Sequence, residues 1–338
     1  MTRPLHPRPQ LGAALLSAML TVTLVASLSA AALWSQWRSI EIERSVRLQS
    51  ASQWVLTGAL DWARLILRED ARNGGADHLA EPWAVPLQDA RLSSFLATDA
   101  NTTDEDGLQQ AFLSGAITDL QGRININNLV MGANSNPPPQ GDKPTTGAAG
   151  AVAAGARVSE AELKNLARLF ELLGLPPTEL ASLAENLRLA YDASTEPGAR
   201  LQAPLPPLRL GQLLGLGLSP RSLALLRPHI TLLPIVTPVN LNTAGATVLA
   251  ACIKDLGLAR AQQLVKVRQQ THFKTLADVT RHIGDAGPLD DRQHSVSSRH
   301  FEVMGQLRLD DTVVQQTSVV QRDGLNVKVL WRDAGPAK

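Results

Sequence analysis

The sequence predicts an α+β fold in which a long N-terminal helix packs on an antiparallel sheet and an all-α domain is inserted into the sheet-forming part. Three observations support this prediction. The chain opens with an uncharged apolar run that continues as an amphipathic helical pattern, its middle repeats apolar residues at helical spacing, and its C-terminal part alternates as strands do. With 338 residues, 44% of them hydrophobic, the chain is long enough to bury a core.

The apolar run lies between Arg8 and Arg38, where no charged side chain occurs. Its stretch Leu11–Leu33 is long enough, at about 1.5 Å per residue, to cross a hydrocarbon core of roughly 30 Å. The basic residues before it favour a cytoplasmic N-terminus, because positive charge tends to stay on that side. We therefore expect a single-pass anchor with the rest of the chain outside.

A cleaved secretory signal peptide is the alternative, since the small residues Ser29–Ala32 could serve a signal peptidase. However, no Gly or Pro occurs from Ala13 to Thr57, and apolar residues recur at helical spacing beyond the run. One continuous helix to about residue 70 is therefore the preferred interpretation.

This long helix resembles that of type IV pilins and pseudopilins, and Gln10–Leu16 resembles their leader cleavage site. The resemblance implies that prepilin peptidase cuts between Gly12 and Ala13 and that Ala13 becomes the N-methylated first residue. Most pilins carry Glu at the fifth mature position, where this chain has Ser17. The K type of minor pseudopilin in type II secretion typically lacks that Glu, which suits a subunit with nothing ahead of it.

The segment Ile117–Leu129 predicts a turn at Gln121–Gly122 between two short β segments. It also resembles the D-x-x-G-R-h-N-h-N-x-L segment of the K-type pseudopilins. An ordinary hairpin is the alternative.

The middle of the chain predicts a linker followed by helices. Residues 132–155 are rich in Gly, Pro, Ala, Asn and Thr, a composition that favours a flexible linker. Ser159 with Glu162 predicts a capping box at the start of a helix that ends at Gly174. Further helices are expected at about 180–191, 208–214 and 220–226.

The motif Val239–Ala244, h-N-h-N-T-A, opens a later helix and resembles both the K-type insert and helix-hairpin-helix DNA-binding modules. DNA binding by that module needs a Gly-h-Gly turn that presents backbone N–H groups to phosphate. The corresponding turn, Leu256–Ala259, has one Gly, so a scaffolding role is preferred, with Thr243 capping the helix. Membrane-anchored DNA uptake remains the alternative function.

Acidic residues between positions 97 and 107 could bind calcium, which prefers six to eight hard oxygen ligands. These candidate ligands are Asp99, Asp104, Glu105 and Asp106. A solvated turn or helix cap built from Asx residues explains the same composition without an ion. The acidic, Trp-containing loop that K-type relatives associate with metal is replaced here by Glu185–Arg188 and Tyr191–Asp192, so their calcium ligands cannot be carried over.

Composition gives no support to two functional classes. A formal net charge of +1 gives no reason to expect nucleic acid as a partner. The lone Cys252 lies in an apolar run that favours a buried thiol, and the seven His match no catalytic motif, so we expect no enzyme.

The C-terminal part predicts an antiparallel meander, with a hairpin turn at Asp323–Gly324. With these strands, the resemblance to K-type minor pseudopilins extends over nearly the whole chain. It implies a pilin-like fold divided into a leader (1–12), a transmembrane part of the N-terminal helix (13–34), a first pilin-like part (35–131), a linker (132–155), an inserted α-helical domain (156–290) and C-terminal strands (291–338).

The same resemblance implies a non-enzymatic function at the tip of the periplasmic pseudopilus, in pseudopilus initiation and protein export across the outer membrane. The partners it implies are minor pseudopilins of the I and J classes, the major pseudopilin, the inner-membrane assembly platform, prepilin peptidase and secreted substrates. The expected location is the inner membrane, with the C-terminal part in the periplasm.

Overall fold

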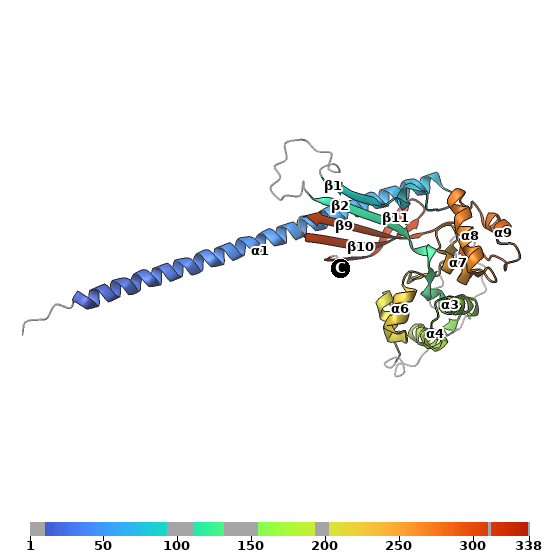
Figure 1. Ribbon diagram of the computed structural model, residues 1–338, viewed down its shortest axis with the longest axis horizontal. Coiled ribbons are helices and arrows are strands. Elements are labelled where there is room, and N and C mark those ends of the chain that lie inside the picture. Colours follow the sequence, from blue (N-terminus) through green and yellow to red (C-terminus); the bar gives the residue numbers. More distant parts are fainter. Residues whose placement is uncertain (1–10, 93–110, 132–154, 193–202, 310–311, 337–338) are drawn as a thin grey trace, which may run out of the picture.

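The computed structural model describes residues 11–92, 111–131, 155–192, 203–309 and 312–336. One helix, α1 (Leu11–Asn73), runs through the whole N-terminal part as predicted. From Ala13 to Arg47 every residue of α1 is exposed, and only beyond this point does the helix lie on the rest of the molecule. Figure 1 shows the first half of α1 as a rod that projects from the sheet.

The second half of α1 packs one face on an antiparallel five-stranded sheet. The buried residues recur every three or four positions, as a helix face requires: Leu56, Leu60, Ala63 and Leu67. The strand order is β1 (Leu87–Arg91), β2 (Phe112–Asp119), β9 (His300–Leu309), β10 (Thr312–Asp323) and β11 (Asn326–Pro336).

The predicted C-terminal meander is confirmed, since β9, β10 and β11 follow one another in sequence and in the sheet. Gly324 takes φ 55° in the β10–β11 turn, a conformation that favours glycine. The strand β1 was not expected, because its sequence, Leu-Gln-Asp-Ala-Arg, lacks the β-branched and aromatic residues that indicate strands.

The helical part lies at the end of the sheet away from the free end of α1 (Figure 1). It consists of α3 (Glu160–Leu172), α4 (Pro177–Tyr191), the 3₁₀ helix η5 (Leu210–Leu216), α6 (Pro220–Leu226), α7 (Ala246–Cys252), α8 (Gly257–Gln270) and α9 (Leu276–Ile283). Three two-stranded pairs join its segments, β3 (Ile124–Asn125) with β6 (Ile230–Thr231), β4 (Val130–Met131) with β5 (Arg157–Val158), and β7 (Val239–Asn240) with β8 (His294–Ser295).

Leucine-rich faces of these helices share one continuous core with Ile124–Val130. The sheet and α1 have separate, smaller clusters around Phe301 and Leu307. Because residues 132–154 lie outside the described residues, the linker and the domain boundaries remain predictions.

The turn predicted at Gln121–Gly122 between two short β segments is confirmed, but the alternative, an ordinary hairpin, does not form. After β2 the chain makes two 3₁₀ turns, η3 (Leu120–Gly122) and η4 (Ile126–Leu129), and the strand between them pairs in parallel with β6 of the helical part. The alternating pattern suggested a half-exposed strand, but Asn125 and Asn127 are as buried as the isoleucines beside them. Their side chains donate to the carbonyls of Ile235 and Leu233, which removes the usual cost of burying an amide.

Two predicted helix caps also differ. Ser159 is the N-cap of α3 but its side chain makes no capping bond, and Glu162 is instead buried and accepts hydrogen bonds from Asn165 and Gln293. Thr243 does not cap α7, which begins after Gly245. In both cases the side chain expected to cap the helix is bonded to a residue distant in sequence, Glu162 to Gln293 and Thr243 to Asp119. The end of α3 at Gly174, with φ 64°, is as predicted.

Candidate assembly surface

The N-terminal part of α1 carries the predicted processing and docking residues. Gly12 and Ala13 lie in its first turn, and the exposed Ser17 donates its hydroxyl to the carbonyl of Ala14 at 2.9 Å. A hydroxyl satisfied within its own helix offers no charge to a neighbouring subunit. Among the described residues α1 is the one helix apolar enough to span a membrane, with a mean hydropathy of 1.9 in its most apolar window. It therefore fits a single-pass membrane anchor.

The four predicted calcium ligands, Asp99, Asp104, Glu105 and Asp106, lie outside the described residues. At the position of the family's acidic loop, Glu185 and Asp192 instead pair with Arg188, at 2.7 and 3.2 Å. The guanidinium already neutralises these carboxylates.

A different acidic cluster, which the sequence gave no reason to expect, lies just after α1. Carboxylate oxygens of Asp70, Asp77 and Glu81 come within 4.8 Å of one another. Arg322 of β10 forms ion pairs with both Asp70 and Asp77, so its guanidinium already neutralises part of the charge. Burial and the neighbouring carboxylates raise the pKa of Glu81 to about 7. Arg322 is 245 positions from Asp77, so no local pattern could have indicated the cluster.

The junction between the sheet and the helical part is a buried polar network centred on Asp119, at the end of β2. Its carboxylate accepts hydrogen bonds from the hydroxyls of Thr243 and Ser298, both at 2.6 Å, from the Asn240 side chain at 3.0 Å, and from the Gln121 backbone at 2.8 Å. Burial raises the pKa of Asp119, although each of these donors favours the charged form. The network therefore joins the D-x-x-G-R motif, the N-x-N-T motif and the chain just before β9.

Packing at this junction is tight as well as polar. A Cβ added to Gly122 would lie 2.9 Å from the Thr243 hydroxyl and 3.1 Å from the Thr243 carbonyl carbon. Asn242 donates to and accepts from the backbone of Phe273, at 2.9 Å in both cases. The two motifs singled out in the sequence thus hold the helical part at one orientation on the sheet.

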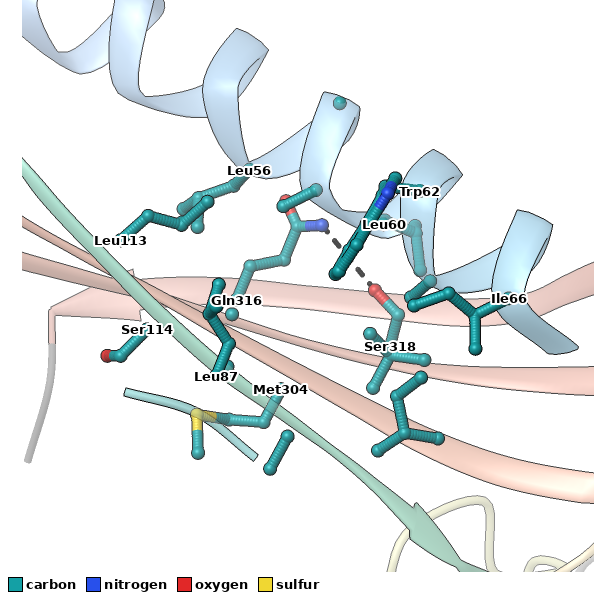
Figure 2. A pocket seen from close by; sticks show the side chains of 18 of the residues that line it. Leu56, Leu60, Trp62, Ile66, Leu87, Leu113, Ser114, Met304, Gln316 and Ser318 are labelled. Carbon is teal, nitrogen blue, oxygen red and sulfur yellow. Dashed lines mark hydrogen bonds between the residues drawn. The ribbon is translucent and has the colours of Figure 1, made fainter. Parts of the chain in front are cut away.

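A groove of about 700 Å³ lies beside α1 rather than at the junction. Its walls are α1 and the chain around η1 (Pro82–Ala84), and its floor comes from β2, β9 and β10. Figure 2 shows Leu60, Trp62 and Ile66 of α1 on one side and Leu113, Ser114 and Met304 of the strands on the other.

The floor of the groove is open because its strands carry small residues there. Gly115 of β2 lies opposite Gly305 of β9, and a Cβ on Gly115 would meet the Met304 carbonyl at 2.9 Å. The lining is mostly apolar, and the polar side chains Gln316 and Ser318 bond each other at 3.5 Å (Figure 2). Such a surface suits an apolar partner.

The remaining candidate for chemistry, Cys252, is a core residue as predicted. It is 4% exposed, and burial raises the pKa of its thiol well above the usual range. A thiol held in this neutral form is a poor nucleophile.

Comparison with known proteins identifies the family. Two family models described as "Type II secretion system (T2SS), protein K" match residues 122–235 and 239–297. The chain is 27% identical to the type II secretion system protein K of Pseudomonas aeruginosa, over 97% of this chain and 94% of that protein.

The fold is also similar to a solved structure. A chain in the crystal structure of the GspK–GspI–GspJ complex from enterotoxigenic Escherichia coli superposes with a TM-score of 0.60 at 18% identity, covering 87% of this chain and 99% of that one. The two family models together span more than half of the sequence, include the N-x-N-T motif and the D-x-x-G-R motif from Gly122 on, and agree with the fold. The chain belongs to the protein K family of minor pseudopilins of the type II secretion system.

Proposed function

We propose that this minor pseudopilin occupies the tip of the periplasmic pseudopilus, where it helps to initiate the fibre and to export proteins across the outer membrane. The observation that carries the proposal is the position of the helical part, at the end of the sheet away from the free end of α1 (Figure 1). In a fibre built from parallel α1 rods, this bulk would obstruct a subunit placed directly above it.

Ser17 supports the same position. In a subunit that docks beneath another, a carboxylate near the start of α1 would offset the charge of its neighbour's terminal amine in lipid. The hydroxyl of Ser17 carries no charge and bonds within α1. A first subunit, with none ahead of it, has no such amine to neutralise.

Processing and orientation follow from the same proposal. Prepilin peptidase would cleave between Gly12 and Ala13 and leave a methylated Ala13, and α1 would cross the inner membrane with the C-terminal part in the periplasm. N-terminal mass spectrometry of the purified native protein tests this. A chain that begins near Ala32 would show instead that the apolar run is a removed signal peptide.

The proposed partners are minor pseudopilins of the I and J classes, consistent with the complex in which the similar fold occurs. Contacts with the major pseudopilin, the assembly platform and secreted substrates belong to the same proposal. Full-length chain co-expressed with its I- and J-class partners and purified in detergent should yield a three-subunit complex. Recovery of the chain alone, with both partners present in the membrane, would contradict the tip assignment.

DNA uptake is not favoured by the family match. The hairpin before α8 has Asp255 with φ 60° and Gly257 with φ 67°, so a turn exists, but it has one Gly where the DNA-binding turn has two. DNA binding through phosphate would appear at low salt and weaken as the salt concentration rises. We therefore expect no shift of DNA in a mobility-shift titration at low salt.

A further inference from the structure

Histidine side chains lie at two places where the sheet and the helical part meet. His78, in the chain that follows α1, stacks on His272, between α8 and α9, with ring centroids 3.8 Å apart and an angle of 13° between the ring planes. His300, the first residue of β9, is fully buried, and its Nδ1 lies 3.3 Å from Oε1 of Gln121 in η3. The Gln121 amide in turn donates to the carbonyl of Pro238, in the helical part, at 3.2 Å. Each place therefore joins the two parts.

The stack of His78 and His272 depends on uncharged rings. Nearly parallel imidazole planes direct their nitrogen lone pairs side by side, so the two rings do not converge on one metal ion. Two neutral rings in this arrangement attract each other, whereas two imidazolium cations at the same separation repel each other. Both residues are half-buried, so water screens this repulsion only in part.

His300 also depends on remaining neutral. Oε1 of Gln121 already accepts a hydrogen bond from the Arg299 backbone N–H at 2.7 Å, and because it is an acceptor, Nδ1 of His300 carries the ring proton. Nε2 of His300 has no hydrogen-bond partner among the described residues. A second proton on the ring would create a buried charge without an acceptor, which is costly.

We propose that these three histidines make the orientation of the helical part on the sheet sensitive to acid. Neutral rings hold the two parts together, and protonation favours a state in which the junction opens and water reaches His300 and the stack. This response adds a conformational device to the Asp119 junction, and it does not depend on where the subunit lies in a fibre.

The pKa values set the direction of the response. Burial, together with His272, lowers the pKa of His78 below its usual 6.5, and burial, together with Arg299, lowers the pKa of His300 to about 4. The closed junction therefore binds these protons more weakly than an open one does. Its stabilisation by the histidines is complete above about pH 6.5 and is lost progressively as the pH falls towards about 4.

Other charged groups face these histidines. Asp70 of α1 favours the charged form of His78, and Glu81, whose carboxylate accepts from the His78 backbone N–H at 2.8 Å, has its pKa raised to about 7. Burial also raises the pKa of Asp77 and Asp119, so protonation of these carboxylates opposes the response of the histidines. The other charged or titratable groups on the elements packed there are Arg299, Arg322, Lys274, Asp278, Arg281 and His282.

The test measures the orientation directly. Spin labels at Gln270→Cys on α8 and Lys328→Cys on β11, both exposed, report the distance between the helical part and the sheet in the full-length chain in detergent. Cys252 is buried and is the one natural cysteine, so it does not take up label. We expect one narrow distance at pH 8 and a broader distribution at pH 5. The same distribution at both pH values would overturn the proposal.

Two variants remove the charges and leave the carboxylates in place. His272→Phe keeps a stacked ring, and a protonated His78 is attracted to the face of that ring. His300→Asn keeps a donor near the Nδ1 position for Gln121 but does not titrate. Each variant should reduce the broadening at pH 5, and the double variant should remove it. Broadening that persists in the double variant would mean that other groups cause it, and the proposal would fail.

The matched control is His282→Asn. This exposed histidine of α9 contacts the Phe273 ring within the helical part, so its loss should leave the broadening at pH 5 unchanged. A reduction as large as that of His272→Phe would contradict the assignment to the stack.

A second pair of labels separates release of the helical part from its unfolding. Gln270→Cys with Glu171→Cys places both labels inside the helical part, at exposed positions of α8 and α3. This distance should stay narrow at pH 5. If it broadens together with the first one, acid unfolds the helical part instead of releasing it from the sheet, and the proposal is overturned.

Discussion

The junction around Asp119 and the groove beside α1 are both places where β2 meets other parts of the molecule, yet they are built in opposite ways. At the junction, Asn240, Thr243 and Ser298 donate hydrogen bonds to the Asp119 carboxylate. Gly122 lies against Thr243 there. In the groove the surface is apolar and Gly58 faces open space. Buried polar networks fix one geometry, whereas an exposed apolar face gains free energy only when something covers it. The first orients parts of one subunit, and the second is suited to association.

The largest effect should come from the buried charge that supports the junction. Replacing Arg322 with Met leaves Asp70 and Asp77 without their cation, and the loss of a buried partner typically costs about 3 to 5 kcal/mol of unfolding free energy. Urea unfolding, followed by Trp fluorescence, measures this. The control is Arg72→Ala, whose ion pair with Glu69 is half-exposed and should be worth less than about 1 kcal/mol.

Asp119→Ala tests the centre of the junction. The hydroxyls of Thr243 and Ser298 and the amide of Asn240 would lose their shared acceptor in a buried site, which we expect to cost about 3 kcal/mol. The same unfolding measurement applies. A loss as small as that of the exposed Asp61→Ala variant would mean that water replaces the carboxylate, and that the junction is less rigid than its geometry indicates.

The two glycines sharpen the comparison directly. Gly122→Ala places a methyl group against the Thr243 backbone, which should destabilise the protein by about 2 kcal/mol. Gly58→Ala adds the same methyl group to an exposed helix position and should stabilise the isolated subunit by about 0.5 to 1 kcal/mol. Thermal unfolding of both variants shows whether each substitution stabilises or destabilises the subunit. If both change stability in the same direction, the distinction between the tight junction and the open groove is lost.

The effect of pH should be about as small as that of Gly58→Ala. The pKa of Glu81 is about 7 in the folded chain against 4.5 for an unperturbed Glu, so the folded state binds this proton more tightly. Stability should therefore fall as pH rises from about 4.5 to about 7 and then level off, by about 1 kcal/mol once solvent screening of this half-exposed group is included.

Glu81→Gln should remove that fall. Burial and His272 lower the pKa of His78, so His78 makes stability rise with pH, opposite to Glu81. The quantity to measure is therefore the change in unfolding free energy between pH 5 and pH 8, compared between the wild type and Glu81→Gln. If this change is the same in the wild type and in Glu81→Gln, Glu81 is charged throughout this pH range.

The sequence predicted those parts of the fold that depend on neighbouring residues. The continuous α1, the Gly174 helix end and the Asp323–Gly324 hairpin are each set by local periodicity or by a single turn residue. The caps at Ser159 and Thr243 failed because distant groups recruit Glu162 and Thr243 into buried contacts. Of the predicted site residues, the structure places Gly12, Ala13 and Ser17 in α1, but their roles remain predictions.

By itself the sequence determined that the chain carries one long apolar helix, which fits a membrane anchor, and an antiparallel C-terminal meander, because helix and hairpin signals act over a few residues. The tertiary structure alone decided that Asp119, Asn240 and Ser298 share one buried network, and that Gly58, Gly115 and Gly305 line one groove. Residues more than fifty positions apart carry no mutual periodicity, so only the folded sheet brings them together.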